Sequence, residues 1–335
     1  MRYLSVCSGI EAATMAWYHM GWKASGFSEI EPFPSAVLAH HYPTVTNFGD
    51  MTKYKEWNLN ESIDLLVGGT PCQSFSVAGL RKGMDDPRGN LALVYCGMLD
   101  HFKPKWFVWE NVPGVLSSSG GRDFGSFLGA LAELGYGFSY RVLDARFFGV
   151  AQRRRRVFVV GYLGDWRPTA AVLFEQNSLR RDITPRPSPT KGSPAYFESS
   201  LAQYREGDIG ETLKASGGVL AGRSETFIVQ KAYETHPADS RVKEMGETCQ
   251  TVTSRWGTGG GNVPLIENNA TIRRLTPVEC ERLQGFPDNF TNVPWRKSLA
   301  SPDGLRYKAL GNSMAVPVMQ WIGEGIDIVK QNLND

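Results

Sequence analysis

A single thiol follows an apolar run in the first quarter of the sequence. Residues 63–67 are apolar apart from one aspartate, the sequence Gly-Gly-Thr-Pro comes next, and Cys72 follows it. A buried strand that ends in a tight turn presents its next side chains at the carboxyl edge of a sheet, where α/β proteins bind ligands. Buried inert cysteines usually lie inside apolar runs, so the turn favours a reactive thiol over a packed one.

A carboxyl group follows another apolar run. Residues 106–109 are all apolar, and Glu110 and Asn111 come directly after them. In a partly dry cleft such a carboxyl keeps a raised pKa and can share a proton with a heterocycle. A thiolate and a carboxyl at neighbouring strand ends suit attack on an electron-poor ring such as cytosine, whose carbon-5 becomes nucleophilic once a thiolate has added at carbon-6.

Strands and helices alternate through the first half of the chain. The apolar side chains of residues 91–102 recur at the spacing of one helical face. This alternation predicts an α/β fold with a doubly wound, mostly parallel sheet. The predicted strands lie within residues 2–9, 23–31, 63–67, 106–109 and 155–163.

The second half has a different composition. A chain of 335 residues is longer than one core usually grows, so we expect two lobes. Residues 175–270 are rich in Gly, Ser, Thr and Pro, with only short β-like runs, which predicts a smaller β-rich domain; a flexible insert is the alternative. The expected division is residues 1–170 plus 300–335 for chemistry and cofactor binding, and residues 171–299 for target recognition.

Two further patterns are ambiguous by themselves. Gly9 stands where the first strand turns into a helix, and Glu29 follows about twenty residues later, the spacing at which an acidic side chain meets ribose hydroxyls. An ordinary turn would explain the same residues. The basic run QRRRR, residues 152–156, is either a nucleic-acid contact or a solvated charged face. At residues 311–312 a Gly-Asn turn should lead into the last helix, and Thr276 should cap a helix with Glu279.

Composition excludes several classes of protein. The net charge is +2, no apolar run reaches the length of a membrane span, and no secretory leader pattern begins the chain. The five cysteines form no C-x-x-C pair and no cluster with histidine at metal-ligand spacing. We therefore expect a cytoplasmic, reduced, metal-free protein that acts as a monomer without a membrane partner.

Six motifs make the sequence similar to the DNA (cytosine-5) methyltransferases of bacterial or phage type. In chain order they are GGTPCQSFS, DDPRGNL, WENVPG, QRRRR, RRLTPVECERLQGFP and YKALGNSMAVPV. The resemblance covers nearly all of the first 165 residues and the last 65. It implies the S-adenosylmethionine-dependent methyltransferase fold, S-adenosylmethionine as cofactor and duplex DNA as partner.

The resemblance also implies residue roles. Cys72 would attack carbon-6 of a cytosine swung out of the duplex, Glu110 would hold N3 with help from Arg154, and the loop from Gln73 to Arg88 would close over the DNA. The expected catalytic residues are Cys72, Glu110, Arg154 and Arg156. The expected cofactor contacts are Cys7, Gly9, Ile10, Glu29, Ile30, Asp50, Met51, Gly69, Pro71, Asn312 and Ser313. The expected DNA contacts are Gln73, Ser76, Arg88 and Gln152, together with Arg223 and Arg255 in the loops of the second region.

The sequence departs from the family pattern in the first motif. Cys7, Glu11 and Ala12 stand where the family carries an aromatic residue and glycines. This difference concerns the affinity for the cofactor.

Three other functions fit part of the sequence. A transfer RNA cytosine-5 methyltransferase would share the same site, although the long variable segment favours a protein that reads DNA. A non-catalytic binding module is disfavoured because both Cys72 and Glu110 are present. A pyrimidine-nucleotide enzyme with a thiol that attacks carbon-6 would need no such segment.

Overall fold

The computed structural model describes most of the chain. The described residues are 1–59, 61–71, 91–174, 196–200, 203–207, 226–228, 232–235, 242–246, 248–253, 265–268 and 271–334. Of the residues predicted to act, Cys72, Gln73, Ser76, Arg88, Arg223 and Arg255 lie outside these ranges, as does the loop expected to close over DNA.

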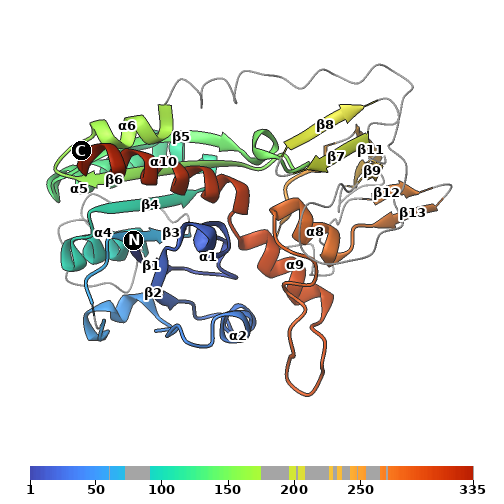
Figure 1. The fold of residues 1–335 in the computed structure, drawn as a ribbon, viewed down its shortest axis with the longest axis horizontal. Coiled ribbons are helices and arrows are strands. Elements are labelled where there is room, and N and C mark those ends of the chain that lie inside the picture. Colours follow the sequence, from blue (N-terminus) through green and yellow to red (C-terminus); the bar gives the residue numbers. More distant parts are fainter. Residues whose placement is uncertain are drawn as a thin grey trace.

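One six-stranded sheet organises the catalytic part of the molecule (Figure 1). Its order is β2-β1-β3-β4-β6-β5, and β1 to β4 run parallel, whereas β6 lies antiparallel between β4 and β5. The mostly parallel sheet expected from the sequence is thus present. The strands are β1 (Arg2–Val6), β2 (Lys23–Ser28), β3 (Leu65–Gly68), β4 (Trp106–Asn111), β5 (Tyr136–Asp144) and β6 (Arg155–Leu163).

Strand β5 was not predicted from the sequence. It lies at the edge of the sheet, and most of its central side chains are half-buried or exposed. An edge strand of this kind has no continuous apolar run, and here polar and apolar residues mix without a clean alternation. The inner strands are buried on both faces and give the stronger signal.

Helices cover both faces of the sheet, as a doubly wound fold requires. Successive strand residues point to opposite faces, so Tyr3, Leu65 and Trp106 join one hydrophobic cluster with α1, α6 and α10. Their neighbours Leu4 and Leu66 join a second cluster with α4 and α5. The helices are α1 (Ala12–Trp17), α2 (Pro32–His41), α4 (Leu91–Phe102), α5 (Arg122–Glu133), α6 (Arg167–Phe174), α8 (Pro277–Gln284), α9 (Asp303–Asn312) and α10 (Val316–Asn334). Short 3-10 helices are η1 (Tyr18–Met20), η2 (Met51–Glu56), η3 (Pro113–Leu116), η4 (Ser118–Gly121) and η5 (Ala145–Phe148).

Short antiparallel strands make up the described part of the second region (Figure 1). Strands β7 (Tyr196–Ser200), β8 (Gln203–Gly207) and β9 (Thr226–Ile228) form a three-stranded sheet. Strands β10 (Ala232–Thr235), β11 (Val242–Gly246), β12 (Leu265–Asn268) and β13 (Thr271–Arg274) form a four-stranded sheet. Buried apolar residues between Leu275 and Val293 belong to a core cluster of the large sheet. The division of the chain into two domains at residues 171 and 299 stays a prediction.

The structure confirms one predicted helix start and corrects a turn. Thr276 caps α8 in a reciprocal capping box with Glu279, as its sequence predicts. Gly311 and Asn312, expected to form a turn before the last helix, instead complete the last turn of α9. The chain changes direction over residues 313–315, before α10 begins.

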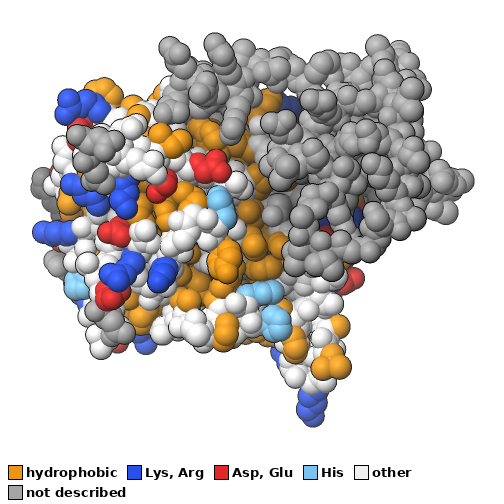
Figure 2. All heavy atoms as spheres, in the orientation of Figure 1, with side chains coloured by type: hydrophobic (Ala, Val, Ile, Leu, Met, Phe, Trp, Pro, Cys, Tyr) orange, Lys and Arg blue, Asp and Glu red, His pale blue; other side chains and the backbone are white. Residues whose placement is uncertain are grey.

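The surface carries both signs of charge. Figure 2 shows Lys and Arg side chains mixed with Asp and Glu over the catalytic part, and hydrophobic side chains gathered over the middle of the same face. Among the described segments, no helix combines the length and apolar character needed to cross a bilayer.

Candidate active site

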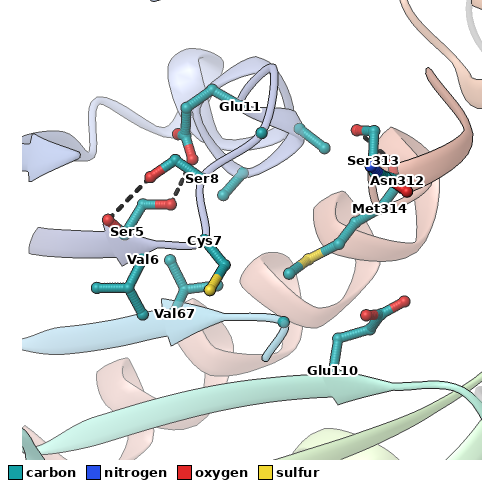
Figure 3. Close-up of a pocket in the computed structure, with 14 residues that line it drawn as sticks. Ser5, Val6, Cys7, Ser8, Glu11, Val67, Glu110, Asn312, Ser313 and Met314 are labelled. Carbon is teal, nitrogen blue, oxygen red and sulfur yellow. Dashed lines mark hydrogen bonds between the residues drawn. The ribbon is translucent and has the colours of Figure 1, made fainter. Parts of the chain in front are cut away.

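A pocket opens at the carboxyl edge of the parallel strands (Figure 3). The turn after β1, the end of β3, Glu110 on β4 and the connection between α9 and α10 all contribute to it. The predicted residues Cys7, Gly9, Gly69, Glu110, Asn312 and Ser313 therefore lie together. The pocket is lined by Ser5, Val6, Cys7, Ser8, Gly9, Glu11, Ala12, Ala13, Val67, Gly69, Glu110, Asn312, Ser313 and Met314.

The turn after β1 adopts an unusual backbone. Cys7, Gly9 and Glu11 have φ values of 48°, 56° and 64°, in the left-handed region that glycine adopts most easily. Glu11 offsets this cost because its carboxylate caps α1, accepting hydrogen bonds from the Thr14 N–H at 3.1 Å and from the Ser5 hydroxyl at 2.5 Å. Glu11 therefore adopts the backbone conformation that glycine adopts most easily, although it is not a glycine.

Glu29 joins the first two strand ends. Its carboxylate accepts hydrogen bonds from the Gly9 N–H at 2.8 Å and the Glu31 N–H at 2.7 Å. Each oxygen keeps lone pairs that hydroxyl groups of a ligand could use. The turn from Gly9 and the carboxylate after β2 therefore meet as the spacing of Gly9 and Glu29 predicts.

The other predicted cofactor residues differ in exposure. Ile30 is 71% exposed beside Glu29, whereas Ile10 is fully buried in a core cluster and does not line the pocket. Asp50 caps η2 by accepting a hydrogen bond from the Thr52 N–H at 2.9 Å. Met51 is buried, and its sulfur lies 3.5 Å from the thiol of Cys7.

Glu110, the residue before the end of β4, lines the pocket and pairs with Arg156. The Nε of Arg156 lies 3.1 Å from Oε1 of Glu110, and both side chains are largely buried. Burial raises the pKa of the Glu110 carboxyl, while the positive charges of Arg154 and Arg156 act in the opposite direction. The group is therefore suited to hold a proton at a higher pH than an ordinary glutamate.

The segment before Cys72 is hydrogen-bonded to β4. The Asn111 amide donates to the Thr70 carbonyl at 2.9 Å, and the Trp109 indole N–H donates to the Thr70 hydroxyl at 3.0 Å. A methyl group on Gly69 would come within 2.9 Å of Oε2 of Glu110, so only glycine leaves that space open. Pro71, the last described residue here, directly precedes Cys72 in the chain.

Arg154 and Gln152 lie elsewhere than expected. The Arg154 guanidinium is buried and donates to the carbonyls of Val252, Gly311 and Ser313, so the direct partner of Glu110 is Arg156. The Gln152 side chain is fully buried, with its amide bonded within the protein. Gln152, expected from the sequence to contact DNA, is therefore buried in this conformation. The hydrogen-bond partners of Gln152 are distant in sequence. The local sequence shows only how many residues separate Gln152 from Arg156.

Some pocket residues were not predicted from the sequence. Glu11 and Met314 line the pocket but were not among the predicted contacts. No local signal marks Glu11, because N-cap positions favour Ser, Thr, Asp and Asn, and a left-handed backbone favours glycine. Met314 directly follows the predicted Asn312 and Ser313.

The described cysteines are poor nucleophiles. Burial raises the pKa of Cys7, Cys96 and Cys249 to about 12, and raises that of Cys280 well above its ordinary value. A thiol with so high a pKa holds almost no thiolate near neutral pH. Within the described ranges, no group of three or more His, Cys, Asp or Glu side chains could hold a metal ion.

Comparisons with known proteins agree with this site. A family model described as C-5 cytosine-specific DNA methylase matches residues 1–327. The chain is 37% identical to a protein of Escherichia phage P1 named DNA N-6-adenine-methyltransferase, over 97% of the chain but only 61% of that relative. It is 30% identical to the type II methyltransferase M.SsoII of Shigella sonnei, over 97% of the chain and 79% of the relative.

A solved structure extends the comparison to the fold. The Dnmt2 methyltransferase of S. pombe is 18% identical, with a TM-score of 0.63 over 100% of both chains. The sheet and these likenesses identify the S-adenosylmethionine-dependent methyltransferase fold. By its match to the family model over residues 1–327, the chain belongs to the C-5 cytosine-specific DNA methylases.

Proposed function

We propose that the protein transfers a methyl group from S-adenosylmethionine to carbon-5 of cytosine in a specific short sequence of duplex DNA. One observation carries the proposal: the pocket joins the Glu110–Arg156 pair to the turns after β1 and β3, and the next residue after Pro71 is a cysteine. The family supports a cytosine substrate.

The turns after β1 and β2 suit a cofactor with a ribose and a charged amino acid group. Glu29 would accept hydrogen bonds from the ribose hydroxyls, and the exposed Ile30 would pack against the adenine. Asp50 and Met51 would approach the same base, while Asn312 and Ser313 would close the pocket from the other side. When bound, the cofactor supplies an electrophilic methyl group on a sulfonium.

The residues of the pocket then carry the chemistry. The Cys72 thiolate adds to carbon-6 of a cytosine that has left the stack, and protonated Glu110 donates to N3, so electron density moves to carbon-5. Arg156 holds the Glu110 carboxyl in place. Cys72 and Glu110 thereby prepare carbon-5 to take the methyl group that the cofactor would supply. A water molecule then removes the carbon-5 proton, N3 returns its proton to Glu110, and elimination frees the Cys72 thiolate.

Residues 171–299 would read the target sequence, with Arg223 and Arg255 contacting bases or phosphates. Gln73, Ser76 and Arg88 would contact DNA beside the flipped cytosine. Exchanging residues 175–270 for those of a relative with another target should change which cytosine is methylated and leave the cofactor requirement unaltered. Methylation of the original site by the exchanged protein would place sequence reading in the rest of the chain.

A labelling experiment tests the reaction. The purified protein is incubated with S-adenosylmethionine carrying a labelled methyl group and with unmethylated duplex DNA, transfer RNA or free cytidine nucleotides. The labelled product is then hydrolysed to nucleosides. Label in 5-methyldeoxycytidine from duplex DNA is the expected result. Label in N6-methyldeoxyadenosine, as the name of the phage P1 relative suggests for that protein, or in transfer RNA would overturn the proposal.

A further inference from the structure

The buried side chains of Gln152 and Arg154 form a junction between two distant segments. The short stretch 151–153 runs beside residues 249–251: the Cys249 N–H donates to the Ala151 carbonyl at 3.1 Å, and the Arg153 N–H donates to the Cys249 carbonyl at 3.0 Å. The Val252 N–H donates to Oε1 of Gln152 at 2.9 Å. The segment that follows strand β11 is thereby fixed to the start of β6.

The junction continues through two glutamine amides to the last turn of α9. Nε2 of Gln152 donates to the Leu283 carbonyl at 2.8 Å and to Oε1 of Gln284 at 3.1 Å. Nε2 of Gln284 in turn donates to the Leu310 carbonyl at 2.5 Å. The side chains of Gln152 and Gln284 are fully buried, so water does not compete for these bonds.

Arg154 bonds directly to both segments of the junction. Its guanidinium donates to the Val252 carbonyl at 3.1 Å, to Gly311 at 3.2 Å and to Ser313 at 2.6 Å. Ser313 lines the candidate cofactor pocket, and Val252 lies in the segment joined to the β-rich region. One side chain therefore bonds both the pocket wall and the segment beyond β11.

The arrangement is not one that stability alone would favour. Nε of Arg154 is buried and has no hydrogen-bond partner among the described residues, which costs folding free energy. A cation buried against carbonyls, with a second arginine beside Glu110, is also expensive to desolvate. Buried ionic groups of this kind can instead fix how two segments are arranged.

We propose that Arg154 is a positioning residue that couples DNA engagement to cofactor binding. DNA held by the β-rich region sets the position of residues 249–252, and Arg154 and Gln152 transmit that position to residues 311–313 at the cofactor pocket. The inference rests on the proposed function, because it assumes that the β-rich region engages DNA. Arg154 thereby acts on the pocket wall, and Arg156 alone contacts the Glu110 carboxyl.

The test measures coupling rather than activity. The target is first mapped by sequencing the methylated cytosines in DNA from a host that expresses the protein. The dissociation constant of S-adenosylhomocysteine is then measured by calorimetry with and without a duplex that carries this mapped target. A coupling of about fivefold or more is expected for the unaltered protein. Arg154→Lys keeps the charge but loses the branched geometry that reaches three carbonyls, so the ratio should fall toward one. Arg155→Lys is the matched control, because Arg155 is the exposed neighbour and its substitution should leave the ratio unchanged.

A second variant covers the case in which Arg154→Lys fails to fold. Gln284→Met keeps the length of the side chain and removes the amide that joins Gln152 to Leu310, and it should lower the ratio in the same direction. An unchanged ratio in folded Arg154→Lys or Gln284→Met, or no coupling in the unaltered protein, overturns the inference. If the unaltered protein methylates no DNA, the proposed function fails instead, so the two failures are distinguishable.

Discussion

Two arginine–glutamate pairs in this molecule have different surroundings. Glu281, fully buried between α8 and α9, accepts hydrogen bonds from the N–H groups of Asn289 and Thr291, from the Thr291 hydroxyl and from Arg306 at 3.0 Å. Glu110 accepts one contact, from Arg156, within the described chain, and its other oxygen faces the space kept open by Gly69. A carboxylate that accepts hydrogen bonds on both oxygens within the protein stabilises a fold, whereas one with an oxygen open to a pocket can act on a ligand.

The largest effect should follow from Glu110→Gln. The amide keeps the shape of the side chain but cannot donate and regain a proton at N3 of the ring. Methyl transfer should therefore fall by at least about a hundredfold, the usual contribution of a general acid or base. The measurement is single-turnover transfer to target duplex at saturating cofactor. Turnover within a few fold of the unaltered protein would mean that another group activates the ring.

The same substitution should change the pH dependence. Burial raises the pKa of Glu110, and the donating form is the protonated one, so turnover should decline on the alkaline side as Glu110 loses its proton. Glu110→Gln cannot lose that proton and should lack the alkaline decline. An identical alkaline decline in both proteins would assign it to another group.

Glu281→Gln should act on stability. It leaves the Arg306 guanidinium without its buried counter-charge, a loss of about 3–5 kcal/mol in the free energy of unfolding. Denaturant unfolding measures it, and turnover per folded molecule should stay close to normal. The matched control is Asp288→Asn, because the Arg282–Asp288 pair lies nearby but is about half exposed, and exposed pairs contribute only about 0–1 kcal/mol. Equal losses in both variants would remove the distinction between the two pairs.

The smallest effect should come from Gly69→Ala. The added methyl group would lie 2.9 Å from Oε2 of Glu110 and 3.4 Å from Cε of Met314, both at the ends of flexible side chains. These side chains can move at a cost of about 0.5–1.5 kcal/mol, so turnover should fall about twofold to tenfold. A rate equal to that of the unaltered protein would show that the free oxygen of Glu110 needs no open space there.

The sequence predicts the site best where its signals are local. Buried strands such as β3 and β4 are continuous apolar runs, so their ends, and Glu110 with them, could be placed in advance. The edge strand β5 mixes polar and apolar residues and could not be found this way. Glu11 could not be placed either, because glycine is the residue expected for its left-handed backbone.

Long-range contacts explain the remaining differences. Gln152 and Arg154 lie in a run of arginines that is typical of a solvated or DNA-facing surface, yet both are buried. Their partners are about 100 or more residues away in sequence, at Val252, Leu283 and Ser313. Only the tertiary structure brings these segments together, so the local pattern indicates chemistry near Arg156 but gives no sign of the junction.

The central claim is that Cys72 attacks carbon-6 of the target cytosine. Duplex DNA with 5-fluorocytosine at the mapped target should trap the protein in the presence of S-adenosylmethionine, because fluorine cannot leave carbon-5 as a proton does. Digestion and mass spectrometry of the trapped complex locate the modified residue. We predict a single adduct on Cys72 and none with Cys72→Ser. An adduct on Cys7, Cys96, Cys249 or Cys280, or a Cys72→Ser variant that still traps, would contradict the account.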